Sequence, residues 1–437
     1  MKYNTNILSG TTELLPAQQT QFDYLYSNLT QVFWQSGYQH IVTPILNRTD
    51  TLLAKAGGET EQQIYRVFKT GEEPSHSKQA LRFDHTVPLA RYVVEHNNDL
   101  VFPFKVCQID RNFRGERAQH GRLREFYQCD IDVIGRQKLS ISYDVDVIDT
   151  LSRALKAILT AKCTVQISNR KLLKGMLQEL NLNQYTTEIS HIIDRSAKVP
   201  AEKTQADFVK LKLSEDSVVK ITTFTQIHGQ RAEVIKRLQA FEFEDQIFNE
   251  GIAELDTILE QLEALFAKDS QIQIVADMAI VRGLDYYTGT IFETIVTEHP
   301  EYGSVCGGGR YENLAGFYTN QTFPGVGGSI GLSRLFATLD SRYFVQPNST
   351  HPVDIVIAPI TEQEFATANQ LATQLRTQGL SIDVIFAGKK LADRLKYATK
   401  IAPAGIVIGS DEATTGAFKV KIFATGDEIS LEQYLKD

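Results

Sequence analysis

The sequence predicts an α+β protein of more than one domain, and three observations support this fold class. Two apolar segments, 102–109 and 126–134, flank a polar, arginine-rich stretch, as in antiparallel strands joined by a long loop. A helical region without glycine-rich or arginine-rich motifs occupies about 170–267 and reads as an insertion. Beyond Pro347, strands and helices alternate, which is typical of a small α/β domain.

The N-terminal elements follow from periodicity. An amphipathic helix is expected over about 18–35, where apolar residues recur every three or four positions. Residues 40–46 favour a strand because the segment is rich in β-branched residues, although Pro44 restricts its pairing. After the two antiparallel strands, we expect a helix over about 144–159 and a strand over 164–168.

The remaining elements complete the domain prediction. Three helices are expected in the insertion, and strands resume at 271–278 and 290–296, with glycine clusters at 307–309 and 325–331. The C-terminal strands are expected at 353–360, 381–386 and 405–408, with helices around 365–375 and 391–398. We therefore expect a domain over 1–345, interrupted by the insertion at 170–267, and a second over 350–437.

Composition excludes several classes of protein. The 437 residues are 42% hydrophobic and 22% charged, a globular balance. The sequence has no run of 18 apolar residues, so no transmembrane helix is predicted. The N-terminus lacks the basic segment followed by an apolar segment that marks a secretory signal. The four cysteines are widely spaced, which disfavours a zinc site or a disulfide framework. We expect a reduced, cytoplasmic compartment.

The net charge of −8, from 45 basic and 53 acidic residues, argues against a generally basic nucleic-acid binder. A local basic patch changes that conclusion. Residues 389–400 hold Lys389, Lys390, Arg394, Lys396 and Lys400 against one acid, Asp393. Because phosphate contacts depend on where cations lie, this patch is a candidate RNA surface, with a solvated helix face as the alternative.

The arginine-rich stretch is the first candidate site. Five arginines fall between positions 111 and 124, and strand alternation places Arg114 and Glu116 on one face with Phe113 on the other. A solvated charged loop is the ordinary alternative. Arginine's planar fork suits phosphate and carboxylate oxygens, so the pattern favours polyphosphate binding.

A second candidate site spans 281–289, where Arg282, Asp285, Tyr286 and Tyr287 stand between glycines. A buried polar network beside a turn is the alternative, because buried polar groups need partners. The glycine clusters at 307–309 and 325–331 allow the backbone to approach a neighbouring group closely. The second cluster does not fit the dinucleotide-binding G-x-G-x-x-G pattern.

Together these segments resemble the histidyl-tRNA synthetase family of class II aminoacyl-tRNA synthetases over essentially the whole chain. The helix and strand around Pro44 resemble motif 1, which builds the dimer interface, while 111–135 and 325–335 resemble motifs 2 and 3. Residues 282–287 resemble the histidine-specific signature, and 306–311 its glycine-rich neighbour. The resemblance implies a catalytic antiparallel sheet flanked by helices, a helical insertion domain and an anticodon-binding α/β domain.

The resemblance also implies a reaction: activation of L-histidine with ATP and Mg²⁺, then transfer to the 3′ end of tRNA(His) by a homodimer. Arg114 and Arg282 would be catalytic and would act at the α-phosphate. Glu116 would face the adenine, and Arg122 and Arg334 the outer phosphates. No prosthetic group or dedicated protein metal cage is implied. These are positioning and electrostatic roles.

Histidine recognition follows from the same resemblance. Asp84 and Thr86, helped by Gln128, would hold the ammonium group, while the imidazole pocket would consist of Asp132, Tyr286 and Tyr287. An acid and a tyrosine hydroxyl can address both ring nitrogens. For tRNA, the basic patch supplies tentative contacts at Lys389, Lys390, Arg394 and Lys396.

Some positions depart from the family pattern. Asp84 and Asp132 replace glutamates common in bacterial members, and Ser333 stands where motif 3 usually has an acid. His85 and His120 are expected to be packing or loop residues. One rival is a non-catalytic paralogue resembling the regulatory subunit of ATP phosphoribosyltransferase, a family without the C-terminal domain. Another is a different adenylate-forming ligase on the same fold, which the signature at 282–289 disfavours.

Overall fold

The structure, a computed structural model, describes residues 4–53, 58–73, 77–119, 121–196, 199, 201–281, 286–313, 315–347, 349, 351–385 and 390–436. The chain divides into two compact units. One comprises Met1–Thr12 and Leu25–Val345, and the other Glu13–Tyr24 and Gln346–Asp437. The predicted α+β fold is confirmed. None of the described helices is long and apolar enough to cross a membrane.

The first unit is built on a sheet that has nine strands in the described residues, in the order β1-β5-β6-β12-β11-β10-β7-β9-β8. The strands from β5 to β7 pair antiparallel, as the sequence predicts for the arginine-rich hairpin, whereas β1 and β9 join parallel at the two sides. Their bounds are β1 Gln39–His40, β5 Phe104–Phe113, β6 Glu125–Ile134, β7 Cys163–Asn169, β8 His228–Gly229, β9 Ile272–Asp277, β10 Thr290–Val296, β11 Ser304–Tyr311 and β12 Gly325–Ile330.

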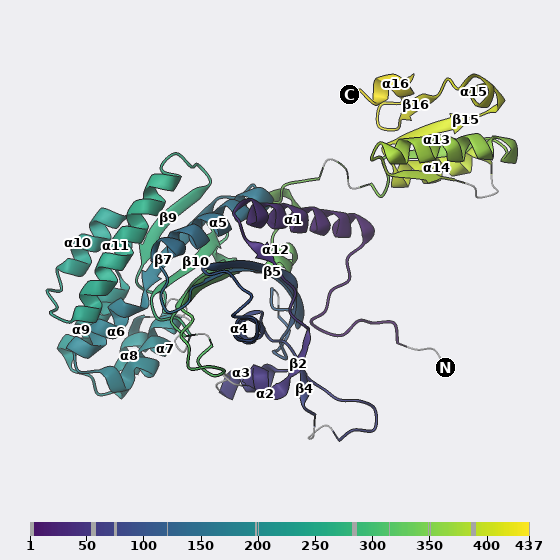
Figure 1. The fold of residues 1–437 in the computed structure, drawn as a ribbon. Helices are drawn as coiled ribbons and strands as arrows, with labels where there is room; N and C mark the ends of the chain where they lie inside the picture. The colour runs from purple at the N-terminus through teal and green to yellow at the C-terminus, as the bar shows by residue number, and fades with distance from the viewer. Residues whose placement is uncertain are drawn as a thin grey trace. The chain divides into compact units, whose positions relative to one another are not determined.

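Helices pack on this sheet. Helix α4 (Thr86–Glu95) lies inside the curve of the strands (Figure 1), and Leu89 and Val93 on it share a buried cluster with Val106 of β5. Helix α5 (Ser142–Ile158) packs against β12, and α12 (Leu332–Thr338) against β6. The amphipathic N-terminal helix is α1 (Pro16–Gln35). Val106 pairs in register with Asp132 of β6, so α4 lies on the face of the sheet that carries the Asp132 side chain.

The prediction of one strand over 40–46 is wrong. The segment is divided between β1 and β2 (Leu46–Arg48), and β2 belongs to a separate sheet with β4 (Gln79–Leu81) and β3 (Arg66–Val67). Pro44 lies between β1 and β2 and has no N–H to continue a ladder. Two short helices, α2 (Thr49–Leu53) and α3 (Gly58–Gln63), accompany this small sheet.

The region 170–267 is helical, but it has more helices than the three apolar stripes predict. Its longest helix, α11, packs against α6, α10 and α5. The short strand β8 pairs with β9, so this region also extends the main sheet. The bounds are α6 Arg170–Glu179, α7 Thr186–Ser196, α8 Ala201–Lys210, α9 Glu215–Thr225, α10 Arg231–Gln239 and α11 Gln246–Phe266.

The second unit contains a sheet in the order β14-β13-β15-β16-β17, whose first three strands are parallel. Helix α13 packs its apolar side on Ile355 and Ile357, whereas α14 packs on Val356, so the helices cover opposite faces. The antiparallel β16 and β17 are not predicted by the sequence. The bounds are β13 Ile355–Pro359, β14 Ile382–Val384, β15 Ala404–Ile408, β16 Lys419–Ile422, β17 Glu428–Ser430, α13 Phe365–Thr377, α14 Leu391–Ile401, α15 Ser410–Thr415 and α16 Leu431–Tyr434.

Candidate active site

Two adjoining cavities lie over strands β6, β11 and β12. The larger has a volume of about 450 Å³ and the smaller about 290 Å³. Their walls share four residues, Arg114, Gln128, Gly307 and Ser329. The two cavities therefore form one site with two compartments, joined where Arg114 stands.

Strand alternation and glycine build the floor of the smaller cavity. Gln128, Asp130 and Asp132 occupy alternate positions of β6 and so share one face, and Asp132 pairs in register with Gly327 of β12. A Cβ on Gly327 would lie 2.0 Å from Asp132 Oδ1, and one on Gly308 would lie 2.1 Å from the Gly327 carbonyl oxygen. The glycine clusters thus let two strands and a carboxylate approach closely, which side chains would prevent.

Two of the predicted acids line the smaller cavity, and each has one oxygen held by the protein. Asp84 Oδ1 accepts a hydrogen bond from the backbone N–H of Val87 at 3.1 Å, at the start of α4. Asp132 Oδ1 accepts one from the hydroxyl of Tyr311 at 2.9 Å. Burial raises the pKa of Asp132 well above its usual value, and the charge of Asp130 acts in the same direction.

Three tyrosines close this cavity. The rings of Tyr286 and Tyr287 meet edge to face with centroids 4.9 Å apart, and Tyr286 lies 5.4 Å from Tyr311. Burial raises the pKa of both Tyr286 and Tyr287, so their hydroxyls stay protonated at neutral pH and can donate hydrogen bonds. Thr86, from the same segment as Asp84, also lines this cavity.

Sequence reasoning missed two residues here, Tyr311 and Asp130. Both line the smaller cavity together with the predicted residues. The sequence could have identified Asp130 as a site residue, because it alternates with Gln128 and Asp132 on a predicted strand and so shares their face. Tyr311 ends the glycine-rich segment 306–311, but its contact with Asp132 joins positions 179 residues apart.

Arg114 stands at the junction of the two compartments. Its guanidinium lies over the ring of Phe83 at 4.4 Å and that of Phe126 at 5.1 Å, and its Nε donates to the Phe83 carbonyl oxygen at 3.4 Å. Burial lowers the pKa of Arg114, while the nearby charges of Asp84 and Glu116 oppose that shift. The side chain is thereby held as an oriented cation.

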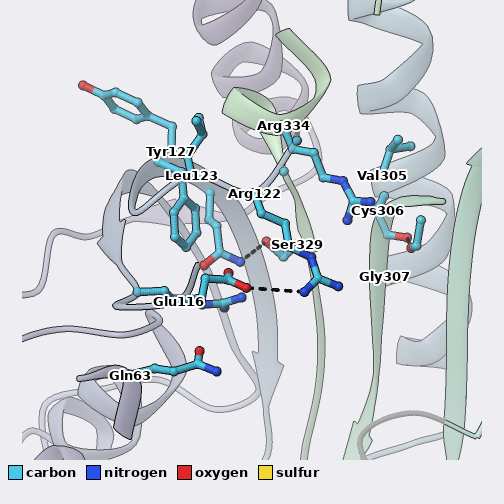
Figure 2. Close-up of a pocket in the computed structure, with 16 residues that line it drawn as sticks. Gln63, Glu116, Arg122, Leu123, Tyr127, Val305, Cys306, Gly307, Ser329 and Arg334 are labelled. Atoms are coloured by element: carbon cyan, nitrogen blue, oxygen red, sulfur yellow. Dashed lines mark hydrogen bonds and ion pairs between the residues drawn. The ribbon is translucent and has the colours of Figure 1, made fainter. Parts of the chain in front are cut away.

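The larger cavity is rich in arginine. Figure 2 shows the guanidinium of Arg122 pointing toward Glu116, and their Nη1 and Oε2 atoms lie 3.5 Å apart. Arg334, on α12, donates through Nη2 to the carbonyl oxygen of Tyr302 at 2.6 Å. With Arg114, these side chains place three guanidinium groups in one cavity wall. Such a wall suits a polyanion.

Side-chain hydrogen bonds connect β6 to both of its neighbouring strands, β5 and β12. Gln128 Nε2 donates to Ser329 Oγ at 3.0 Å, and Gln128 Oε1 accepts from Asn112 Nδ2 at 2.8 Å. Ser333 on α12 accepts a hydrogen bond from the backbone N–H of Tyr127 at 2.8 Å. The hydroxyl of Ser333 therefore joins α12 to β6.

Other predicted residues lie elsewhere. Arg282, Lys389 and His120 fall outside the described residues. Lys390 and Lys396 are exposed at and on α14 in the second unit, but Arg394 is half-buried and donates to the carbonyl oxygens of Pro359 and Ile360. Within the described residues, no group of three or more His, Cys, Asp or Glu side chains could hold a metal ion.

Comparison with known proteins gives consistent matches. Residues 10–335 match the family model described as histidyl-tRNA synthetase, and residues 354–436 match an anticodon binding domain. A protein from Clostridium acetobutylicum named histidine–tRNA ligase is 39% identical over 432 residues, covering 98% of each chain. One from Clostridium tetani with the same name is 38% identical over 434 residues, covering 99% of this chain and 97% of its own. The crystal structure of histidyl-tRNA synthetase from Nostoc sp. superposes with a TM-score of 0.87 at 33% identity, covering 98% of this chain and 97% of its own.

Proposed function

The chain belongs to the histidyl-tRNA synthetase family, and on this premise we propose that it works as a histidine–tRNA ligase. Histidine and ATP form histidyl-adenylate and pyrophosphate, and the histidyl group then passes to the 3′ end of tRNA(His) with release of AMP. One observation carries the proposal: an acidic compartment and an arginine-lined compartment share Arg114 in their common wall. An amino acid, through its ammonium group, and a nucleoside triphosphate fit these two compartments.

The adenylation step needs charge stabilisation and alignment. The substrate carboxylate attacks the α-phosphorus, the bond to the β-phosphate oxygen breaks, and pyrophosphate leaves. Arg114 binds the α-phosphate, and its two flanking phenylalanine rings hold the guanidinium plane in place. Arg282, by family resemblance, adds a second fixed cation there. Positioning and preorganised charge are the main sources of rate in such a transfer.

The acidic compartment recognises histidine. Asp84, Thr86 and Gln128 hold the ammonium group. Asp132, Tyr286 and Tyr287 surround the imidazole, and the Tyr311 hydroxyl fixes the orientation of the Asp132 carboxyl group. A site whose buried polar groups pair with the substrate rejects amino acids that leave those groups unpaired, by up to about 10⁴–10⁵.

The arginine-lined compartment binds ATP. Glu116 faces the adenine, and Arg122 and Arg334 bind the outer phosphates. The ion pair between Glu116 and Arg122 is long and Arg122 is exposed, so both groups can turn to the nucleotide at low cost. ATP enters as its Mg²⁺ complex, in which phosphate oxygens and water supply most of the ligands.

The partners follow from the same function. The exposed Lys390 and Lys396, with Lys389, contact the tRNA from the second unit, while Arg394 holds α14 to the end of β13. The protein forms a homodimer through its motif 1 segment and works in the cytoplasm, where tRNA is charged. Family membership supports both proposals.

Histidine-dependent exchange of pyrophosphate into ATP tests the function. The expected result is exchange with histidine and none with other amino acids, followed by charging of tRNA(His). Tight histidine binding without exchange would contradict the proposal and favour the regulatory paralogue. A solved structure titled as such a regulatory subunit or synthetase, from Bacillus halodurans, is 20% identical with a TM-score of 0.76, which shows a common fold alone.

A further inference from the structure

Asp130 is a third carboxylate of the smaller cavity, and none of the roles above uses it. It lies on β6 between Gln128 and Asp132, lines the cavity and is only 7% exposed. Its Oδ1 is buried and has no hydrogen-bond partner among the described residues. A buried carboxylate oxygen without a partner is unfavourable and needs an explanation.

The other oxygen of Asp130 is held by a buried histidine. Nδ1 of His85, a residue that is 1% exposed, lies 2.9 Å from Asp130 Oδ2. An ionised carboxylate can only accept a hydrogen bond, so His85 Nδ1 is the donor when Asp130 is ionised. Gln108 Nε2 approaches the His85 carbonyl oxygen at 3.5 Å, and Thr43 Oγ1 donates to Gln108 Oε1 at 2.9 Å.

All three carboxylates of the cavity therefore share one arrangement. Asp84, Asp130 and Asp132 each use one oxygen to bind the protein, through Val87, His85 and Tyr311 respectively. The function above already assigns Asp84 and Asp132 to the substrate. The second oxygen of Asp130, Oδ1, is buried without a partner among the described residues, and Asp130 lines the cavity, so a substrate donor seated against this wall would supply the missing hydrogen bond.

The position of Asp130 identifies that donor. Along β6, Gln128 belongs to both compartments and so marks the end where the substrate carboxylate reacts, whereas Asp132 belongs only to the acidic one. Asp130 lies between them. His85 lies between Asp84 and Thr86 in the sequence, the residues assigned to the ammonium group. Its hydrogen bond with Asp130 therefore holds the Asp130 carboxyl group next to that segment.

We propose that Asp130 is a further histidine-recognition residue, which accepts a hydrogen bond from the α-ammonium group of the substrate. His85 is a positioning residue that fixes the Asp130 carboxylate for this contact. This inference rests on the proposed function, because it takes the amino-acid substrate from it. The donor is cationic, which matches a cavity with three acids.

The test compares two ligands on the whole protein by calorimetry. Histidine and imidazolepropionate both carry the imidazole and carboxylate groups, and only histidine has the ammonium group. In Asp130→Asn the affinity for histidine is expected to fall roughly 10- to 100-fold, as for a lost hydrogen bond between charged groups, while imidazolepropionate binding changes less than about threefold. Asp146→Asn is the matched control. It removes a carboxylate of α5 that binds Tyr38 and Lys105, and it should change the affinity for neither ligand.

Equal losses for both ligands, or no loss for either, would overturn the recognition role of Asp130. The positioning role has its own test. His85→Leu removes the donor and is expected to raise the KM for histidine with little change in the KM for ATP. His85→Asn, whose amide can donate from nearly the same place as Nδ1, should restore most of the lost affinity.

A His85→Asn variant no better than His85→Leu would contradict the positioning role, provided that both melt at similar temperatures. Failure of the proposed function can be distinguished from failure of this inference by the exchange assay. If the proposed function is wrong, the unchanged protein shows no histidine-dependent pyrophosphate exchange, whatever the behaviour of Asp130→Asn. Exchange by the unchanged protein with identical ligand affinities in Asp130→Asn rejects this inference alone.

Discussion

Replacing Tyr311 by phenylalanine tests the imidazole pocket through a residue that is not among those predicted from the sequence. The substitution removes only the hydroxyl that donates to Asp132 Oδ1 at 2.9 Å. The ring should stay in place, because it is buried and packs closely on Gly325, where a Cβ would lie 2.5 Å from the Tyr311 hydroxyl oxygen. The variant therefore isolates one hydrogen bond.

The magnitude follows from burial. Asp132 is 7% exposed, so its Oδ1 loses a partner without gaining water. Leaving a buried acceptor unsatisfied costs about 1–3 kcal/mol. At 1.36 kcal/mol per tenfold, kcat/KM for histidine should fall roughly 5- to 150-fold. The KM for ATP should stay unchanged, because Asp132 and Tyr311 line only the smaller cavity.

Pyrophosphate exchange measured against histidine and ATP concentration is the assay. Tyr318→Phe is the matched control, since Tyr318 packs in the same small cluster as Tyr311 but donates to the Thr51 carbonyl oxygen at 2.9 Å, outside both cavities. It should lower thermal stability slightly and leave the KM for histidine alone. If Tyr311→Phe keeps its KM for histidine within twofold, or raises the KM for ATP equally, the orienting role of Tyr311 is refuted.

Four further substitutions test other parts of the two compartments and of the second unit. Asp132→Asn should stabilise the ligand-free protein at neutral pH. Because burial raises the pKa of the Asp132 carboxyl group, the folded state binds more protons than the unfolded state, and the contribution of Asp132 to stability falls as pH rises from about 3.8. Melting curves at acid and neutral pH should show the gain only at the higher pH. Arg114→Lys should lower the rate of exchange by about 10²–10³ with a normal melting temperature, because lysine cannot keep the planar contact with two rings; a rate within threefold of the unchanged protein would contradict this. Lys396→Ala should raise the KM for tRNA without altering exchange, whereas Arg394→Ala should lower the melting temperature of the second unit; equal melting temperatures would show that the carbonyl contacts of Arg394 do not matter.

Local patterns were sufficient where an element depends on its own residues. The spacing of Phe22, Leu25 and Leu29 predicts helix α1, and the alternation of strand and helix patterns beyond Pro347 predicts the α/β unit. They were insufficient where an element depends on its partner. β16 and β17 are held by pairing with β15 and with each other, and the strand expected at 40–46 divides because Pro44 cannot donate to a ladder.

The candidate site divides in the same way. The residue types, such as the arginines at 111–124 and the acids on β6, already tell which chemical groups the site contains. Which of these groups meet depends on the tertiary fold. Strand order brings Gly327 beside Asp132, the hydroxyl of Tyr311 onto that carboxyl group, and buried His85 onto Asp130. Each of these contacts joins segments far apart in the chain, and the physical reason is that strand pairing and burial, which no local pattern records, set the register between them.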